Sequence, residues 1–174
     1  MSNSLSSFDL FQRLKTSEIY NKISRPIIIA DDIRTPENMG SIIRLGANIG
    51  TLKVIFISNK ASEFKNYKIN KTASGAALKT EWLIVEDFES AIKALPKDYE
   101  LIAIETSNDS KDIFKAKMPE NIAFVIGNEI KGINPSILNQ IETKLHIPIP
   151  GPISSLNVTH ALSVALFEWF RQQN

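Results

Sequence analysis

The stretch IAFVIGNEIKG, residues 122–132, decides the fold class. Its first five residues form an unbroken apolar run, which is typical of a strand buried on both faces of a parallel sheet. The run passes directly into a loop that carries Gly127, Asn128, Glu129 and Gly132. Loops at the carboxyl ends of parallel strands bind ligands, and glycine permits close backbone approach. The stretch therefore predicts a ligand-binding loop, although a structural hydrogen bond of Glu129 would also explain it.

Short apolar runs alternate with amphipathic stretches over most of the chain, which predicts an α/β fold with a mostly parallel sheet flanked by helices. Strands are expected at 26–30, 53–57, 82–85, 101–104, 122–126 and 145–148. Helices are expected at 36–49, 87–95 and 135–141, with a leading helix near 8–23 and a closing helix near 155–171. We expect one domain over residues 1–174, in which residues 1–25 are a short helical appendage.

The composition excludes several classes of protein. The 174 residues are 43% hydrophobic and 22% charged, with a net charge of +1 and no cysteine. Without cysteine there is no disulfide scaffold, thiolate zinc site or cysteine nucleophile. No window reaches the roughly 18 apolar residues of a membrane span, and the opening residues lack a signal-peptide core. We expect a cytoplasmic protein that does not enter a membrane.

Charge is unevenly distributed along the chain. Residues 53–79 contain six lysines and one glutamate, giving +5, whereas residues 81–109 contain eight acidic residues and two lysines, giving −6. Two solvated surfaces would explain this pattern. A local phosphate-facing patch on a neutral protein is the alternative.

The helix expected at 36–49 has clear start signals, because Thr35 is a good N-cap and Pro36 suits the first helical position. Arg44 falls on its polar side, leaning back over Gly40. The missing side chain at Gly40 would leave room for a ligand to approach the guanidinium. An exposed arginine above a tolerated glycine is the alternative.

The segment from Ile147 to Asn157 contains three prolines and a glycine, which predict an extended path with free backbone groups. Such a path can bind a flat base through main-chain hydrogen bonds. Ser155 and Asn157 then stand near a helix N-terminus, where they either cap the helix or orient a ligand. The closing helix is apolar on nearly all sides, so it is either a central core helix or is covered by a second subunit.

Three segments together resemble a known family. These are N-x-G-x-x-x-R from Asn38 to Arg44, G-N-E-x-x-G from Gly127 to Gly132, and Ile147-Pro148 leading to Ser155-Leu156-Asn157. In this order they resemble the three motifs of the SpoU (TrmH) family of RNA 2′-O-ribose methyltransferases, over about residues 26–170. Residues 71–76, KTASGA, resemble a further segment of that family. Neither a G-x-G-x-x-G fingerprint nor a P-loop is present.

The resemblance implies a C-terminal trefoil knot (the SPOUT, or alpha-beta knot, fold), S-adenosylmethionine bound in that knot, and a homodimer with the closing helix in its interface. It implies an enzyme that methylates a ribose 2′-hydroxyl of structured RNA. We expect tRNA rather than rRNA, because the long N-terminal domain of some rRNA-modifying relatives is absent from the sequence. An rRNA methyltransferase and a catalytically retired RNA-binding protein of the same fold are the alternatives.

The resemblance also assigns roles to residues. The catalytic set is Arg44, Asn38, Glu129, Ser155 and Asn157. The cofactor-binding set is Gly127, Ile147, Ile149, Ser155 and Leu156, to which strand-end geometry adds Thr106. No metal ligand is expected. Because guanidinium stays protonated, we expect Arg44 to bind phosphate and stabilise the developing alkoxide, and we expect structural roles for His146 and His160.

Overall fold

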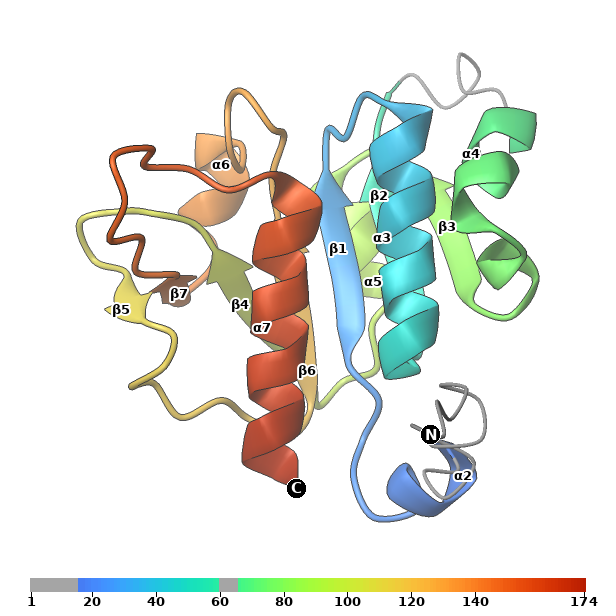
Figure 1. Cartoon of the computed structure of the whole chain (residues 1–174), viewed down its shortest axis with the longest axis horizontal. Helices are drawn as coiled ribbons and strands as arrows, with labels where there is room; N and C mark the ends of the chain where they lie inside the picture. Colours follow the sequence, from blue (N-terminus) through green and yellow to red (C-terminus); the bar gives the residue numbers. More distant parts are fainter. Residues whose placement is uncertain (1–15, 60–65) are drawn as a thin grey trace, which may run out of the picture.

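The computed structural model describes residues 16–59 and 66–174, and its centre is a seven-stranded sheet in the order β3-β2-β1-β6-β4-β7-β5 (Figure 1). Every ladder between neighbouring strands is parallel. The strands are β1 (Ile27–Asp31), β2 (Lys53–Ile57), β3 (Glu81–Val85), β4 (Glu100–Ile104), β5 (Lys111–Asp112), β6 (Ile122–Ile126) and β7 (Thr143–His146). The predicted α/β class is therefore confirmed.

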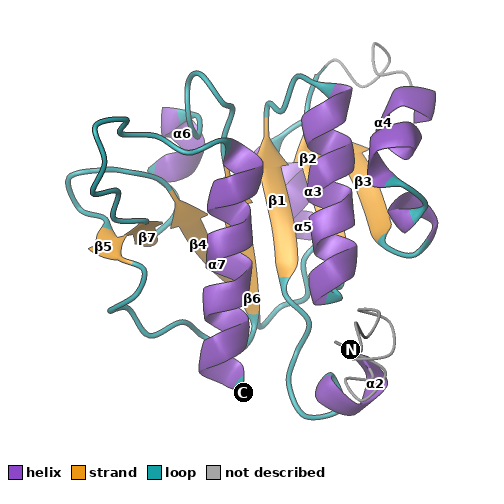
Figure 2. Cartoon of the chain, viewed as in Figure 1, coloured by secondary structure: helices purple, strands orange, loops and turns teal. Residues whose placement is uncertain are grey.

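Helices cover both faces of the sheet, with α3 and α7 side by side on one face (Figure 2). The helices are α2 (Thr16–Ile19), α3 (Pro36–Ile49), α4 (Asn66–Ala73), the 3₁₀ turn η2 (Ala76–Leu78), α5 (Phe88–Lys93), α6 (Pro135–Leu138) and α7 (Val158–Gln173). Alternate residues of each strand point to opposite faces. Ile28 and Phe124 therefore join the core under α3 and α7, whereas Ile29 and Val125 join the core under α5 and α6.

The strand order places a topological switch point between β1 and β6. The chain proceeds from β1 through β2 to β3 on one side, and the later strands lie on the other side of β1. In open α/β sheets, ligands bind outside the carboxyl ends of the strands at such a point. The loops that follow β1, β6, β4 and β7 meet at this edge, and they carry most of the predicted site residues.

The six predicted strands are present, and the differences lie at their ends. The last strand spans Thr143–His146 rather than 145–148, so Ile147 and Pro148 belong to the following loop. β5 was not predicted, because two residues carry no periodic signal. α7 begins at Val158 rather than at residue 155, because Asn157 caps it by accepting a hydrogen bond from the backbone N–H of Thr159 at 2.9 Å.

Two predicted helices differ more strongly from the structure. Residues 8–15 of the leading helix lie outside the described residues, and the described helical part is Thr16–Ile19. The helix expected at 135–141 ends at Leu138. Ile141 still reaches the core at 2% exposure through a turn, which explains its apolar signal. The knot and the division into one domain with an appendage stay predictions.

Gly40 has a different role from the one expected of it. The helix α4, which was not predicted, packs directly on α3 at this glycine (Figure 1). A Cβ added at Gly40 would lie 2.7 Å from the carbonyl oxygen of Ile69 and 2.7 Å from the Cβ of Thr72. The prediction of open space for a ligand above Gly40 is therefore wrong, because the space is filled by α4.

The closing helix α7 is a core helix of this chain. Leu162, Leu166 and Trp169 are all 0% exposed. The apolar surface around them is therefore covered within one chain, and it does not by itself call for a second subunit. On the outer side of the helix, Phe167 remains 51% exposed.

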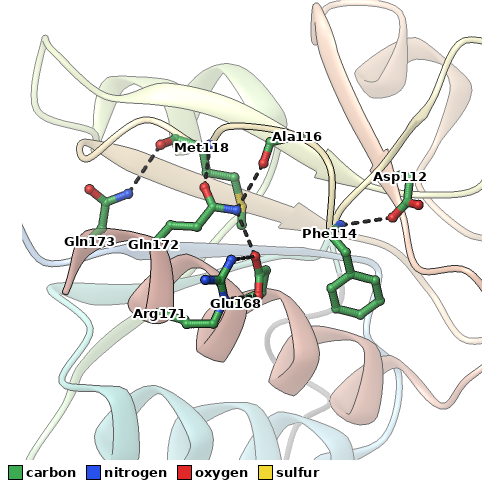
Figure 3. Close-up of polar contacts among 8 residues, drawn as sticks. All are labelled: Asp112, Phe114, Ala116, Met118, Glu168, Arg171, Gln172 and Gln173. Atoms are coloured by element: carbon green, nitrogen blue, oxygen red, sulfur yellow. Dashed lines mark hydrogen bonds and ion pairs between the residues drawn. The ribbon is translucent and has the colours of Figure 1, made fainter.

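The end of α7 also fastens the segment that leads into β6 (Figure 3). The Gln172 side chain accepts a hydrogen bond from Met118 N at 2.9 Å and donates one to the carbonyl of Ala116 at 3.0 Å. Gln172 also donates to Glu168 at 2.9 Å, and Glu168 accepts two bonds from Arg171 at 2.7 and 2.8 Å. This network holds the closing helix against residues 116–118.

Within the described parts of the chain, none of the helices has both the length and the apolar character needed to cross a bilayer.

Candidate active site

The loop after β6 is closed by a pair of backbone hydrogen bonds. Asn128 N donates to Gly132 O at 3.0 Å, and Gly132 N donates to Asn128 O at 2.9 Å. A Cβ added at Gly127 would lie 2.1 Å from the backbone of Gly132 and Ile133, so only glycine fits there. Gly132 itself has φ +69°, in the left-handed region. The prediction that these glycines permit a tight turn with close backbone approach is confirmed.

Two side chains, one in the loop and one after β4, hold the loop in place. The amide oxygen of Asn128 accepts hydrogen bonds from Ile130 N at 2.9 Å and Lys131 N at 3.2 Å, and its amide nitrogen donates to Asp32 O at 2.8 Å. Glu105, which follows β4, accepts a bond from Ile133 N at 2.9 Å. The loop is therefore tied to the ends of β1 and β4.

Glu129 reaches from the same loop to the start of α3. The side-chain amide of Asn38 donates a short hydrogen bond to the Glu129 carboxylate. Asn38 N is itself held by the Thr35 side chain at 3.2 Å, which confirms Thr35 as the N-cap. This contact joins the first and second sequence motifs across 91 positions of the chain.

Residues 147–157 run as an irregular loop from β7 to α7, as expected from their prolines. Ser155 is exposed and does not cap α7, because Asn157 does so. The interpretation of Asn157 as a capping residue is confirmed. The side chain of Ser155 is consequently available to a ligand.

A cavity of about 250 Å³ opens among the loops that follow β4, β6 and β7. It receives seven of the residues predicted for the site: Thr106, Gly127, Glu129, Ile147, Ile149, Ser155 and Leu156. The apolar part of its wall is completed by Ile104, Ile126 and Val158. The cavity is therefore built from the second and third motifs and from the end of β4.

Asn38, Arg44 and Asn157 do not line this cavity. Asn38 touches its wall through Glu129, and Asn157 fixes the start of α7. Arg44 lies six residues beyond Asn38, about 9 Å further along α3 at 1.5 Å per residue. It is exposed, and no hydrogen bond or ion pair ties its guanidinium to another described residue.

A second, larger cavity of about 770 Å³ lies on the other side of the Asn128–Gly132 turn, at the carboxyl ends of β1, β2 and β3. Asp31 lines it with 5% exposure and accepts a hydrogen bond from Asn134 N at 2.7 Å. Burial raises the pKa of the Asp31 carboxyl above its ordinary value. None of residues 147–157 reaches this cavity, so the smaller one is where the motifs converge.

The sequence did not indicate Glu105 or His146, which line the smaller cavity, or the bracing role of Asn128 in its loop. A Gly-Asn pair at the end of a buried strand is a turn signal that could have indicated the role of Asn128. The roles of Glu105 and His146 depend on contacts between segments far apart in sequence. No cluster of three or more potential metal ligands occurs among the residues that the structure describes.

A model of the SpoU rRNA Methylase family matches residues 25–167. The fold, the convergence of the second and third motifs on one cavity and the contact of the first motif with its wall define an α/β protein with a ligand site at the carboxyl ends of its strands. The chain belongs to the SpoU rRNA Methylase family.

Several relatives are similar over most of the chain. A 23S rRNA (guanosine-2′-O-)-methyltransferase RlmB from Xylella fastidiosa is 29% identical over 84% of this chain and 59% of its own. A tRNA (guanosine(18)-2′-O)-methyltransferase from Aquifex aeolicus is 27% identical over 94% of this chain and 78% of its own. An uncharacterized tRNA/rRNA methyltransferase from Borreliella burgdorferi is 30% identical, and the chain spans 64% of its length.

The fold agrees with a solved structure of the family. The SpoU methyltransferase AviRb from Streptomyces viridochromogenes, in complex with the cofactor AdoMet, superposes with a TM-score of 0.76 at 22% identity. The superposition covers 91% of this chain and 62% of that protein. This likeness supports the same sheet and helix arrangement.

Proposed function

We propose that this chain transfers a methyl group from S-adenosylmethionine to a ribose 2′-hydroxyl of structured RNA. The observation that carries the proposal is the hydrogen bond between Asn38 and Glu129. It ties the helix of the first motif to the wall of a cavity that also receives Ser155 and Leu156 of the third motif. Three motifs that lie far apart in sequence thus form one site.

The residues of the cavity fit S-adenosylmethionine, which supplies an electrophilic methyl group on a sulfonium. The apolar side chains of Ile126, Ile147 and Leu156 offer a surface for a flat base. Gly127 brings backbone rather than side chain to the cavity wall, as main-chain binding requires. Thr106 and Ser155 add hydroxyl groups at its rim.

Arg44 has the chemistry needed on the RNA side. A guanidinium is always protonated and donates in a planar fork that matches phosphate. Arg44 is exposed and unpaired among the described residues, so it can bind the phosphate beside the target ribose and stabilise the alkoxide as the hydroxyl proton leaves. The proton then passes to phosphate or water rather than to Arg44.

The basic segment supports RNA as the partner. Lys68 and Lys71 on α4, and Lys79 after η2, are exposed beside the helix that carries Arg44. We favour tRNA over rRNA, as for the tRNA-modifying relative from Aquifex, which matches 94% of this chain, whereas the rRNA-modifying relative from Xylella matches 84% of it. The rRNA assignment is the second candidate, since both relatives match at similar identity.

We further propose a cytoplasmic homodimer in which the outer face of α7 takes part. The supporting feature is Phe167, which is 51% exposed on that face. The position of Arg44, outside the cavity of its own chain, leaves room for a second copy to complete the RNA site. Sedimentation at micromolar concentration should give a dimer, and Phe167→Glu should give a monomer; a monomeric wild-type protein would contradict this proposal.

Labelled methyl transfer from S-adenosylmethionine to total tRNA and to rRNA tests the function. Mass spectrometry of the digested RNA should find a new 2′-O-methylated nucleoside, in tRNA if our preference is right. Methylation of rRNA alone would support the second candidate. RNA binding without methyl transfer to either RNA would instead indicate a retired enzyme of the same fold.

A further inference from the structure

His146 stands at the end of β7, where it lines the smaller cavity. Its ring nitrogen Nδ1 lies 3.0 Å from the hydroxyl oxygen of Ser110. Ser110 is not part of the cavity wall. One nitrogen of the imidazole is therefore fixed by a side chain that does not itself line the cavity.

The contacts of Ser110 determine which nitrogen of His146 carries the proton. Ser110 Oγ lies 2.7 Å from the carbonyl oxygen of Ser107, and a carbonyl can only accept, so the single hydroxyl proton of Ser110 is used there. Ser107 N donates to the same Oγ at 3.1 Å. The remaining lone pair of Ser110 can only accept from His146, which requires a proton on Nδ1. In neutral His146, Nε2 is then a bare acceptor.

We propose that His146 is a cofactor-binding residue whose Nε2 accepts a hydrogen bond from the exocyclic amine of the adenine base. Nε2 is separated from Nδ1 by one ring carbon and is not used by the Ser110 contact. His146 adjoins Ile147, whose side chain belongs to the apolar wall that a flat base would cover. An acceptor at the edge of an apolar base site distinguishes an amine from an oxo group, because an oxo group brings a second acceptor to the same place.

Ser110 is a positioning residue in this arrangement, since it acts on the base only through the tautomer of His146. The charged groups near the His146 ring do not take over the role of Ser110 in fixing the tautomer. Asp112 is paired with His146 across the β5–β7 ladder, but its carboxylate is bonded to Phe114 N at 3.0 Å and to Lys115 at 3.1 Å. Asp109 is paired with Lys144 at 2.5 Å.

The inference rests on the proposed function, and calorimetry with two ligands separates the two. The probes are S-adenosyl-L-homocysteine and S-inosyl-L-homocysteine, which differ in the amine. The wild-type protein should prefer the adenosyl ligand by about tenfold, and His146→Phe should reduce that preference by roughly 3- to 10-fold, the worth of one hydrogen bond. Binding of neither probe by the wild type would overturn the proposed function. Equal preference in wild type and His146→Phe would overturn only the role of His146.

Conservative variants sharpen the test. The amide of Gln can place an acceptor near the position of Nε2, whereas that of Asn reaches only the position of Nδ1. His146→Gln should therefore retain much of the preference, and His146→Asn should lose it. His160 is the matched control, because it is the only other histidine and is exposed on α7 outside the cavity. His160→Phe should leave both affinities unchanged.

Nitrogen-15 NMR of the His160→Gln protein observes His146 alone. Nδ1 should show the shift of a protonated nitrogen and Nε2 that of an unprotonated one. The Nε2 signal should move on addition of S-adenosyl-L-homocysteine and not with the inosyl ligand. Ser110→Ala should mix the two tautomers and weaken adenosyl binding. A proton on Nε2 in the wild-type ring, or an Nε2 signal indifferent to the adenosyl ligand, would overturn the inference.

Discussion

The side-chain amide of Asn38 donates a hydrogen bond to the carboxylate of Glu129, and this contact joins two motifs that are 91 positions apart. Asn38 sits in the first turn of α3, after β1, and Glu129 sits in the loop after β6. β1 and β6 are neighbours at the switch point of the sheet. The contact therefore fixes the cavity wall to the helix that carries Arg44.

The contact predicts energetic coupling between the two residues. Asn38→Ala and Glu129→Ala should each reduce methyl transfer by roughly tenfold to a hundredfold, because either change frees the loop from α3 and misplaces the site. The double variant should be little worse than the weaker single variant, since both remove the same contact. Single-turnover methylation measures all three.

The exposed ion pair between Glu89 and Lys93 on α5, at 2.8 Å, provides the control for this cycle. Removing either partner should leave methyl transfer unchanged. Fully additive losses of methyl transfer at Asn38 and Glu129 would show that the two residues act separately and that their contact does not contribute to the reaction.

The strands and the longest helices could be predicted because their own residues carry the pattern. β6 is apolar at all five positions and is buried at all five. The helix α3 has a cap, a proline start and a broad apolar side. By contrast, α4 buries only Ile69 and Ala73 of its eight residues, which is too little for a periodic signal. The position of α4 depends on the absence of a side chain at Gly40, and Gly40 lies in another segment of the chain.

The candidate site was predictable where parallel strands end and not where distant loops touch. Gly127, Ile147 and Leu156 reach one cavity because β6 and β7 end at the same edge of the sheet. Glu105 and His146 were missed because their partners, Ile133 and Ser110, lie 28 and 36 positions away. A carboxylate or an imidazole alone carries no sign of such contacts.

Gly40 should be essential for stability rather than for ligand access. Gly40→Ala should destabilise the protein by about 1–3 kcal/mol, because the added Cβ would lie 2.7 Å from the backbone of α4. Gly151→Ala is the control, since no atom lies within 4 Å of its added Cβ. Urea unfolding compares the two. A stable Gly40→Ala protein with weakened RNA binding would restore the role in ligand access.

Glu168 should give the protein a distinct sensitivity to acid. Hydrogen bonds from Arg171 and Gln172 lower the pKa of its carboxyl from 4.5 to about 2. A carboxyl whose pKa is lower in the folded state than in the unfolded state stabilises the protein at pH values above its unfolded pKa. This contribution is lost as the pH falls from about 4.5 to about 2.

Glu168→Gln should therefore lower the melting temperature by several degrees at pH 7 and flatten its dependence on pH in that acidic range. Glu89→Gln, at an exposed ion pair, is the matched control and should have little effect. Thermal unfolding followed by circular dichroism at several pH values measures both. An acid transition of Glu168→Gln identical to that of the wild type would show that the network does not stabilise the fold.

Arg44 separates chemistry from folding, because its side chain is exposed on α3 and has no partner among the described residues. Arg44→Ala should fold, melt and bind cofactor as the wild type does, yet methyl transfer to RNA should fall by at least about 100-fold, the usual effect of losing one transition-state donor. Arg44→Lys should restore little, because an ammonium cannot make the two-pronged contact of a guanidinium. Single-turnover transfer at saturating protein gives the rate, and RNA binding is followed separately as salt is varied.

Asn48→Ala, on the same helix and also exposed, is the control and should methylate normally. Arg44→Ala methylation at close to the wild-type rate would remove Arg44 from the catalytic set and leave the cavity proposal standing.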